Sequence, residues 1–581
     1  MIVLGERFSL LAPHLRRRRC DGFGHGAPNG SAPGDRTETG SSYNLRDSAR
    51  ALHVLAGFRP SIGDVAFMPP SPAAPAASSV NFGFVIDNRR CIGCHACTVA
   101  CKTEHSDPIG INKTWVTYIE KGIFPDASRR FHVMRCNHCA DAPCVEICPT
   151  ASLITREDGI VDFDSDRCIG CKACMQACPY DALTINPDSG TATKCNYCSH
   201  RVDSGRLPAC VVVCPAEAII AGDLNQPNSK IAHIVATEKT SSRKPEKGTV
   251  PNLFYVDGDR AALRPDGALR STTTIWGSRP EDGVDAVSTV DAWKDAPRGT
   301  SKRSYDIAQR HAASWGWKVS AYLFTKSIAA GVVLIPTLLA WFGQAEMAED
   351  LLAIGIPTAF VALAITGVLL VADLKRPERF LWVLLRPQWK SWLVRGAYGI
   401  TGYGGFLTAA WFWPPAAGSP GGLLFLTVGG LLAAFTAAYS GWLFGQAKGR
   451  DLWQSPLAPI HLLVQSVLAG VAMLLLLDPM SRSVLTPLFG GVLVLNGVIV
   501  GVELLGRHAT QDAKRATQIL STGIRGQFLW LGVVLAGHLL PLLALTAESP
   551  GITALAAIGS LVGLVIYEHL WVDAPQRVPL A

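Results

Sequence analysis

Sixteen cysteines between Cys91 and Cys214 constrain this chain more than any other feature. They fall into four groups of four within 124 residues. The first and third groups have the spacing C-x2-C-x2-C-x3-C, and a proline follows the last cysteine of the second, third and fourth groups. The groups are Cys91, Cys94, Cys97 and Cys101; Cys136, Cys139, Cys144 and Cys148; Cys168, Cys171, Cys174 and Cys178; and Cys195, Cys198, Cys210 and Cys214.

This spacing predicts iron–sulfur clusters. In bacterial ferredoxins the same run holds [4Fe–4S] cubes, with three cysteines on one cube and the fourth reaching a second cube. Sixteen ligands therefore predict four [4Fe–4S] clusters. The alternatives are a disulfide framework or zinc ribbons. Zinc sites usually pair C-x2-C units that lie far apart, so the spacing favours clusters.

Around these cysteines the chain resembles the four-cluster electron-transfer subunits of molybdopterin oxidoreductases, such as dimethyl sulfoxide reductase, polysulfide reductase and formate dehydrogenase. The similarity runs from about Phe82 to Gly267, through CIGCHACTVACK, CNHCADAPCVEICP, CIGCKACMQACPYDA and CNYCSHRVDSGRLPACVVVCP. In that family the first cysteine group pairs with the fourth, and the second with the third. The resemblance implies four ligand sets: Cys91, Cys94 and Cys97 with Cys214; Cys195, Cys198 and Cys210 with Cys101; Cys136, Cys139 and Cys144 with Cys178; and Cys168, Cys171 and Cys174 with Cys148.

Residues 1–80 are expected to form an unstructured tail. Ser, Gly, Ala and Pro dominate there, and such a segment buries too little apolar surface to offset its ordering entropy. The basic run Arg16–Arg19 could begin a twin-arginine export signal, but no apolar stretch follows it, so export is not expected. We hypothesise that Met68 is the true start of the protein. Cys20, the one cysteine outside the groups, is expected to have no role.

The predicted cluster domain, residues 81–277, is α+β and double-ferredoxin-like. A strand is expected in INKTWVTYIEKG, ending at Gly122, and a short hairpin in DGIVDFDSDRC. Residues 278–314 are rich in Asp, Lys and Arg and are interpreted as a solvated linker. Residues 315–581 are interpreted as a membrane domain.

Long apolar runs in this second half predict an all-α transmembrane bundle. A span needs about 20 apolar residues. Runs such as LLAIGIPTAFVALAITGVLLVA lack the polar stripe that a soluble helical bundle would need. Eight spans are predicted, at roughly 319–342, 350–372, 396–414, 421–444, 457–477, 485–505, 526–546 and 552–571.

The charge of the connecting loops predicts the orientation. Cytoplasmic loops carry an excess of Lys and Arg. The connections after the second, fourth and sixth spans hold the basic residues, whereas the opposite set has only Arg482. We therefore expect a multi-pass protein of the cell inner membrane with its cluster domain on the cytoplasmic side. The basic residues are Lys375, Arg376, Arg379, Arg386, Lys390, Arg395, Lys448, Arg450, Arg507, Lys514, Arg515 and Arg525.

The membrane half resembles a second family, the NrfD-like membrane subunits of polysulfide reductase. The similarity covers about Trp315 to Leu580 and rests on WKVSAYLFTKSIAAG, ADLKRPERF with SWLVRGAY, AYSGWLFGQ with LWQSPLAPIHLLVQSVLAG, and EHLWVDAPQRVPL. The resemblance implies eight spans, electron exchange with quinone and no haem. In that family the electron-transfer and membrane subunits are usually separate chains.

Ionisable residues inside the spans are the candidates for a quinone site, because a charge in lipid is costly and needs a partner or a role. Lys326, Tyr439 and His461 are predicted to line it, although Lys326 could instead snorkel and Tyr439 could be an aromatic-belt residue. Other polar residues have structural or proton-transfer interpretations. Asp373 and Arg376 are expected to form a helix-end ion pair, Glu503 and Glu568 could begin a proton route, and His538 could bond a neighbouring helix.

The function predicted is that of an electron-transfer and quinone-reactive subunit of a membrane-bound molybdopterin oxidoreductase. No nucleotide fingerprint and no nucleic-acid motif occurs, so substrate chemistry is assigned to a molybdopterin-containing partner. Two alternatives remain open. The chain could be an energy-converting module that couples electron transfer to proton translocation, or a passive anchor without a quinone site.

Overall fold

The computed structural model describes residues 80–122, 125–264, 267–270, 301–305, 314–478, 480–547 and 549–580. All of them fall within one compact unit, Pro75–Ala581. The predictions for residues 1–79, including Met68 and Cys20, lie outside the described residues, as does most of the linker.

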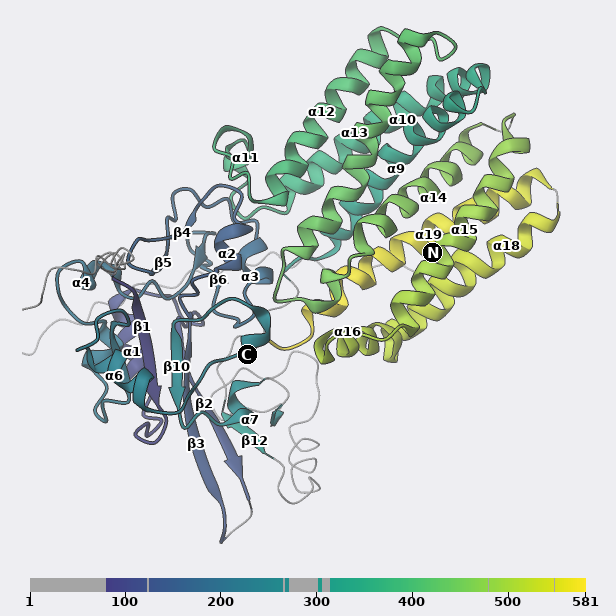
Figure 1. Cartoon of the computed structure of the whole chain (residues 1–581). Coiled ribbons are helices and arrows are strands. Elements are labelled where there is room, and N and C mark those ends of the chain that lie inside the picture. The colour runs from purple at the N-terminus through teal and green to yellow at the C-terminus, as the bar shows by residue number, and fades with distance from the viewer. Residues whose placement is uncertain are drawn as a thin grey trace, which may run out of the picture. The chain divides into compact units, whose positions relative to one another are not determined.

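The first half of the described chain is an α+β domain with two four-stranded sheets (Figure 1). In one sheet, β1 (Phe82–Asp87) lies between β8 (Ile219–Asp223), which is antiparallel, and β10 (Leu253–Val256), which is parallel; β9 (Thr240–Ser241) extends the other edge. The strand that precedes the first cysteine therefore pairs with strands that follow the last one. This sheet therefore joins the two ends of the cluster-binding segment.

The second sheet has the order β11-β12-β2-β3 and is built on the hairpin of β2 (Thr114–Lys121) and β3 (Ser128–Arg135). The strand predicted before Gly122 is β2. The hairpin predicted within DGIVDFDSDRC is only partly correct, because β5 lies in that stretch but pairs with β4, which precedes it. The remaining elements of the domain are short: β4 (Leu153–Thr155), β5 (Val161–Phe163), β6 (Thr184–Ile185), β7 (Ala192–Thr193), β11 (Leu269–Arg270), β12 (Lys302–Tyr305), α1 (Ala96–Glu104), α2 (Pro143–Glu146), α3 (Ala173–Ala177), α4 (Ser199–Val202), α5 (Ala209–Val212), α6 (Lys230–Thr237), η1 (Pro245–Lys247) and α7 (Arg260–Leu263).

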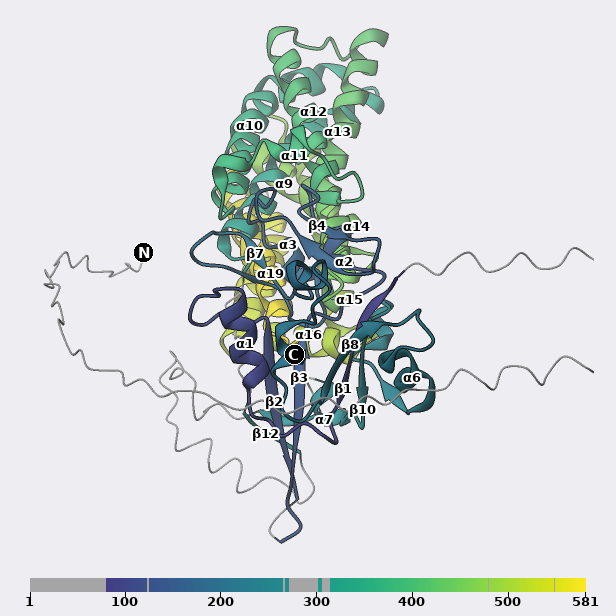
Figure 2. The same cartoon turned by 90° about the vertical axis from the view of Figure 1, so that its left-hand side faces the viewer.

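Long helices make up the second half, and Figures 1 and 2 display α9, α10, α12 and α13 side by side. Helix α9 contacts α10, α13, α14 and α19, so it lies at the centre, and it is the most buried. The elements are α9 (Trp317–Trp341), α10 (Ala345–Ala372), η2 (Pro377–Arg379), α11 (Trp382–Leu385), α12 (Trp392–Phe412), α13 (Pro420–Gly445), η3 (Asp451–Gln454), α14 (Ala458–Leu477), α15 (Arg482–Leu505), α16 (Gln511–Ser521), α17 (Gly523–Gln527), the π-helix η4 (Phe528–Leu539), α18 (Leu540–Ala544), η5 (Leu545–Ala547) and α19 (Pro550–Gln576).

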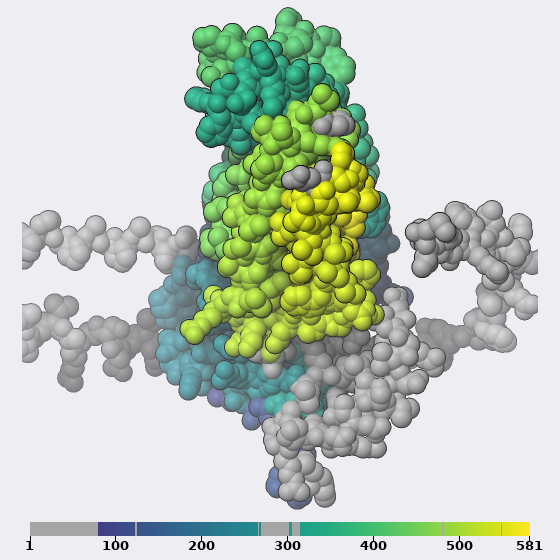
Figure 3. All heavy atoms as spheres, turned by 90° about the vertical axis from the view of Figure 1, so that its right-hand side faces the viewer, coloured from purple at the N-terminus to yellow at the C-terminus, as the bar shows by residue number. Residues whose placement is uncertain are grey.

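Seven helices in the described part of the chain are long and apolar enough to cross a membrane: α9, α10, α13, α14, α15, the continuous Gly523–Ala547 and α19. The third predicted span, 396–414, corresponds to α12, which has five glycines and Arg395 and does not join that set. Figure 3 displays the face formed by the yellow-green helices from α15 onward and yellow α19. Exposed apolar side chains on α15, η4 and α19 include Val494, Val498, Leu531, Leu555 and Val562, which suits contact with lipid.

Candidate functional site: four sets of thiols and a polar pocket among the helices

The sixteen cysteines of the four groups are all free thiols, so no disulfide framework is present among them. Cys91, Cys94, Cys97 and Cys214 line one pocket, and Cys148, Cys168, Cys171 and Cys174 line another. Each of these pockets combines three cysteines of one group with the last cysteine of another. The structure thus brings together the same residues that the resemblance implied for two ligand sets.

The other thiols approach one another in the same manner. Cys101 interacts electrostatically with Cys198 and Cys210, and Cys195 interacts with Cys101 and Cys210. Cys178 in turn interacts with Cys136, Cys139 and Cys144. Among the described residues, no group of three or more Cys, His, Asp or Glu side chains is close enough to hold a single metal ion. Four thiols around a wider space suit a cube, whose ligands are spread over four iron atoms.

Two glycines shape the loops of the first and third groups. Gly93 and Gly170 follow the first two residues of each Cys-Ile-Gly-Cys run, and both have left-handed φ angles, 69° and 68°. At Gly170 a Cβ would also come within 2.6 Å of the Gly190 carbonyl oxygen and of Lys375 Cβ. A side chain there would disturb the loop and its contact with the helices together.

The loop of the third group is the part of the cluster domain that packs on the membrane helices. The indole Nε1 of Trp315 donates to the Cys171 carbonyl at 3.0 Å, and Arg379 Nη1 donates to the Cys168 carbonyl at 2.9 Å. Lys172 forms an ion pair with Asp373 at 2.9 Å. Burial raises the pKa of Asp373 above its ordinary value, although Lys172 opposes this shift. These contacts hold one four-cysteine pocket against the end of the bundle.

Two buried polar residues extend this junction. Gln176 in the short gap between Cys174 and Cys178 bonds Gln576 at 2.8 Å and accepts from Arg450 Nε at 2.9 Å. Arg450 also donates to the Val578 carbonyl at 2.8 Å. Burial lowers the pKa of Arg450 to about 10. Helix α19 therefore continues past its predicted end at residue 571 in order to bind the cluster domain.

Aromatic side chains continue from this junction into the bundle. The ring centroid of Trp315 lies 5.3 Å from that of Phe444, and Phe444 lies 4.9 Å from Trp571. Trp453 stacks on Trp315 at 5.7 Å and donates to the Trp571 carbonyl at 3.0 Å. Packed atoms thus connect the Cys171 loop to Trp571, which lines a pocket between the helices.

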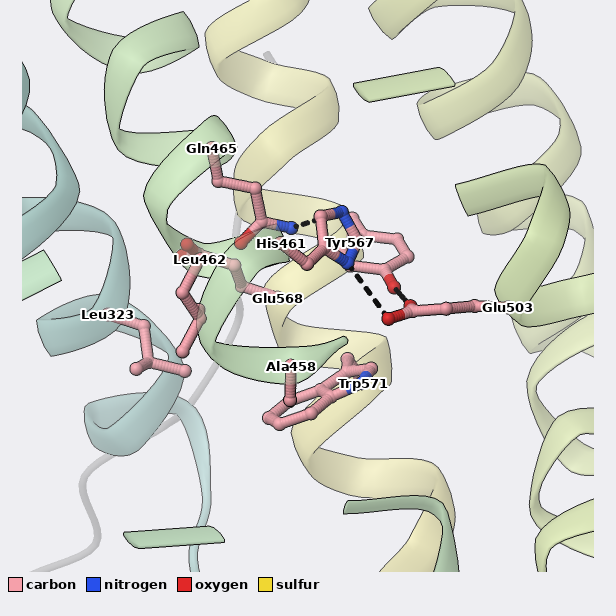
Figure 4. A pocket seen from close by; sticks show the side chains of 9 residues that line it. All are labelled: Leu323, Ala458, His461, Leu462, Gln465, Glu503, Tyr567, Glu568 and Trp571. Carbon is pink, nitrogen blue, oxygen red and sulfur yellow. Dashed lines mark hydrogen bonds and ion pairs between the residues drawn. The ribbon is translucent and has the colours of Figure 1, made fainter. Parts of the chain in front are cut away.

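This pocket is small and contains several ionisable groups (Figure 4). His461 of α14 lies at its centre, with its Nδ1 3.1 Å from Glu503 Oε1 of α15. The hydroxyl of Tyr567 in α19 donates to the other oxygen of Glu503. Gln465 Nε2 lies 3.1 Å from His461 Nε2. The pocket residues are Leu323, Ala458, His461, Leu462, Gln465, Glu503, Tyr567, Glu568 and Trp571.

A second polar group lies on the neighbouring helices. Lys326 is fully buried, so it does not snorkel, and its Nζ donates to the Ala437 carbonyl at 2.8 Å and to Ser440 Oγ at 2.9 Å. The same Nζ lies 5.1 Å from the ring centroid of Tyr439, which is also buried and is therefore no belt residue. Glu568 interacts electrostatically with Lys326 and lines the His461 pocket. It therefore connects the two groups.

The residues predicted from the sequence were thus only partly grouped as expected. Lys326 and Tyr439 are neighbours, whereas His461 belongs to the adjacent pocket with Glu503. The predicted ion pair of Asp373 and Arg376 is wrong, because Asp373 binds Lys172 and Arg376 binds Glu378. Asp373 thus pairs with a lysine of the third cysteine group and not with an arginine of its own connection after α10.

Two polar pocket residues, Gln465 and Tyr567, were missed, and so was Asn496, which bonds His461 from outside the pocket lining. Asn496 Oδ1 lies 3.2 Å from His461 Nε2, and its Nδ2 lies 3.0 Å from His538 Nε2. His538 does bond a neighbouring helix, as one interpretation of its position proposed. Gln465 is one helical turn from His461, and Asn496 interrupts an apolar run, so both carried a signal in the sequence.

A cysteine-rich α+β domain docked on apolar helices is the architecture of a membrane-bound iron–sulfur electron-transfer protein. Residues 90–154 and 128–224 match two families that are each described as a 4Fe-4S dicluster domain. Residues 306–576 match the family described as Polysulphide reductase, NrfD.

Three relatives are similar to the cluster domain. The B subunit of tetrathionate reductase from Salmonella typhimurium is 43% identical over 188 residues, which are 32% of this chain and 75% of that protein. The putative dimethyl sulfoxide reductase iron-sulfur subunit of Halobacterium salinarum is 39% identical over 215 residues, 32% of this chain and 82% of that protein. The B subunit of polysulfide reductase from Wolinella succinogenes is 39% identical over 187 residues, 31% of this chain and 97% of that protein.

The extent of these matches decides the family. The chain belongs to the family of iron–sulfur electron-transfer subunits of reductase complexes, because it covers at least three quarters of each of these relatives. It also carries an NrfD-type multi-pass membrane part in the same polypeptide.

Proposed function

We propose that this protein carries electrons between a molybdopterin-containing catalytic subunit and a quinone in the membrane, through four [4Fe–4S] clusters. The observation that carries the proposal is the docking of the Cys168–Cys178 loop on the bundle, next to a pocket with ionisable residues. One cluster set faces the helices through this loop. The protein would thus place an electron donor or acceptor beside the pocket.

The four clusters would form a chain across the domain. Cys94, from the set that includes Cys214, is exposed, and apolar side chains around it are exposed as well, including Ile92, Val99 and Val212. An exposed apolar patch on a polar domain suits a protein partner. We assign this end to the catalytic subunit and the Cys171 end to the membrane.

The His461 pocket is our candidate for the quinone site, together with Lys326 and Tyr439. A lysine or tyrosine can donate a hydrogen bond to a quinone carbonyl, and a histidine can exchange protons near neutral pH. Glu503 bonds His461 and can hold it in one orientation. Electron transfer to a quinone requires protons as well, so proton donors beside the aromatic residues fit this role.

A wider cavity of about 860 Å³ supports a second candidate function, the coupling of electron transfer to proton movement. It lies between η1, the η3 connection and the α15–α16 connection, and Glu503 lines both this cavity and the His461 pocket. Protons could pass from the cavity through Glu503 to His461. Coupling across the membrane would further need a connection to the opposite end of the bundle, for which His538 is the nearest titratable residue in this chain of hydrogen bonds.

We further propose eight spans and a cytoplasmic cluster domain in the inner membrane. The residues after α10, after α13 and at the end of α19 all contact the cluster domain. Helices α10 and α13 therefore both end at that domain, and α12, which lies between them in the chain, has to run away from it. The path of the chain from the end of α10 to the start of α13 supports α12 as a span despite its glycines.

Purified anaerobically, the protein should contain about sixteen irons, four for each cube.

His461→Gln should lower quinone-linked turnover about 100-fold, in the range of a lost general acid or base, while dye-linked activity and iron content stay unchanged. Tyr439→Phe and Lys326→Met should lower the same rate. His569→Gln is the matched control, because His569 is on the exposed face of α19. Wild-type quinone-linked rates in all three pocket variants would place the quinone elsewhere, and about eight irons would contradict the four-cluster assignment.

A further inference from the structure

A fully buried arginine lies among the thiols of the cluster domain. Arg135 ends β3, directly before Cys136, and none of its side chain is exposed. Its Nη1 donates to Cys210 Sγ at 3.0 Å. Its charge also acts on the thiols of Cys97 and Cys195. The guanidinium thus adjoins two of the four proposed ligand sets.

The charge of Arg135 has no carboxylate partner within the described part of the chain. Its Nε and Nη2 have no hydrogen-bond partner among the described residues, and its Cζ lies 4.5 Å from the centroid of the Phe84 ring. By contrast Lys194, another buried cation in this region, donates to the carbonyls of Val161 and Cys195. Burying an unpaired charge is costly, so an anion has to compensate Arg135. Thiolate-ligated cubes are anions and suit this position.

We propose that Arg135 is a positioning residue that raises the reduction potential of the cluster held by Cys101, Cys195, Cys198 and Cys210. This inference rests on the proposed content of four [4Fe–4S] clusters. The guanidinium stays protonated, so one electron can enter and leave without any proton transfer at Arg135. A fixed positive charge and hydrogen bonds to sulfur both favour the state with the extra electron, and net charge and such bonds are known determinants of cluster potential.

The arrangement also gives this cluster a place in the chain of electron carriers. Arg135 interacts with Cys97 of the exposed set as well, but within the described ranges its side chain donates a hydrogen bond to Cys210 alone. The effect should therefore be largest at the cluster of Cys210, which lies between the exposed set and the sets nearer the bundle. A higher potential there would make this cluster the one that holds an electron when the others are oxidised.

The test is a redox titration of the purified membrane protein, followed by electron paramagnetic resonance. Arg135→Gln and Arg135→Met should lower the equilibrium constant for reduction of one cluster at least tenfold, which is about 59 mV for a one-electron couple. Arg135→Lys keeps the positive charge, so it should lower this equilibrium constant less. Cys198→Ser identifies the signal that belongs to this cluster.

Arg243→Gln is the control, because Arg243 is equally buried but donates to the carbonyls of Tyr180 and Leu580. It should leave all potentials unchanged. Wild-type potentials in Arg135→Gln or Arg135→Met with full iron content would overturn the proposal. So would equal shifts of all four clusters, or loss of iron from both variants, since either result would assign Arg135 a structural role. An iron count near eight in the wild-type protein would instead refute the proposed function.

Discussion

At the level of single residues, the distinctive feature of this molecule is its set of buried ionisable side chains. Lys326 has two oxygen acceptors, whereas neither carboxylate oxygen of Glu568 has a hydrogen-bond partner among the described residues. Both side chains are inside the bundle, where an uncompensated charge is costly. Glu568 is therefore either charge-balanced by Lys326 or protonated, and each state would leave a different signature in mutants.

Lys326→Met should destabilise the protein by about 3–5 kcal/mol if Glu568 is ionised, because the substitution leaves a buried carboxylate without its cation. Adding Glu568→Gln should recover much of this loss, since removing both members of a buried pair costs less than removing one. Thermal unfolding of the two single variants and the double variant in detergent measures the coupling. Additive losses would mean that Glu568 is neutral in the folded protein.

His132 predicts a dependence of stability on pH in the cluster domain. Burial lowers the pKa of His132 to about 4, and its Nε2 accepts a hydrogen bond from the Asp259 backbone N–H. The unfolded chain has the ordinary histidine pKa of about 6.5, so between these values the unfolded state binds more protons and stability rises with pH. The contribution is complete above about pH 6.5 and should be about 2 kcal/mol smaller at pH 5.

Melting temperatures from pH 7.5 to 5 in wild-type protein and His132→Gln measure this contribution. Glutamine can still accept the hydrogen bond from the Asp259 backbone N–H but does not titrate. The melting temperature of His132→Gln should therefore change less steeply with pH than that of the wild type. The matched control is His233→Gln, because His233 is exposed. Identical slopes in wild type and His132→Gln would show that acid acts through other groups, such as the cluster thiolates.

At the level of helices and strands, close approach of α9 and α14 organises the bundle. A Cβ on Gly331 would lie 1.9 Å from the Ser466 carbonyl oxygen, and one on Gly470 would lie 2.2 Å from the Gly331 carbonyl carbon. Small residues at such crossings let two membrane helices pack backbone to backbone. This packing fixes the positions of Lys326 on α9 and His461 on α14.

Gly331→Ala and Gly470→Ala should each destabilise the protein by about 1–3 kcal/mol, as overpacking does. Because the two helices would move apart, quinone-linked turnover should also fall. Gly491→Ala is the control, since nothing lies within 4 Å of a Cβ at that glycine of α15. Unchanged thermal stability in both crossing variants would contradict the close packing.

Local sequence patterns predicted the helices, strands and cysteine groups of this protein better than the long-range contacts between side chains. The cysteine groups, strands β2 and β5 and the apolar helices could all be found in the sequence, because each depends on neighbours within a few residues. The pairing of Asp373 with Lys172 joins residues 201 positions apart, and no local rule contains it. The placement of Asn496 between His461 and His538 likewise depends on how three helices are rotated about their axes.

For the whole molecule, the docking of the cluster domain changes how the basic loops should be interpreted. Arg376 and Arg379 both donate to carbonyls of that domain, at 2.9 Å, and Arg450 is buried against it. Part of the positive charge that predicted a cytoplasmic orientation therefore has a structural use. Arg386, Lys390 and Lys514 are exposed, so their positive charge is available to the solvent and still favours the cytoplasmic side.

A pair of topology reporters separates these two explanations. The first is inserted after Arg386, in the exposed connection that precedes α12, and the second after Gly418, between α12 and α13. If the cluster domain is cytoplasmic and α12 is a span, a reporter active only in the cytoplasm should work at Arg386 and fail at Gly418. Activity at both sites would mean that α12 does not cross the membrane. The reverse pattern would place the cluster domain outside the cytoplasm, and the basic loops would then be explained by docking alone.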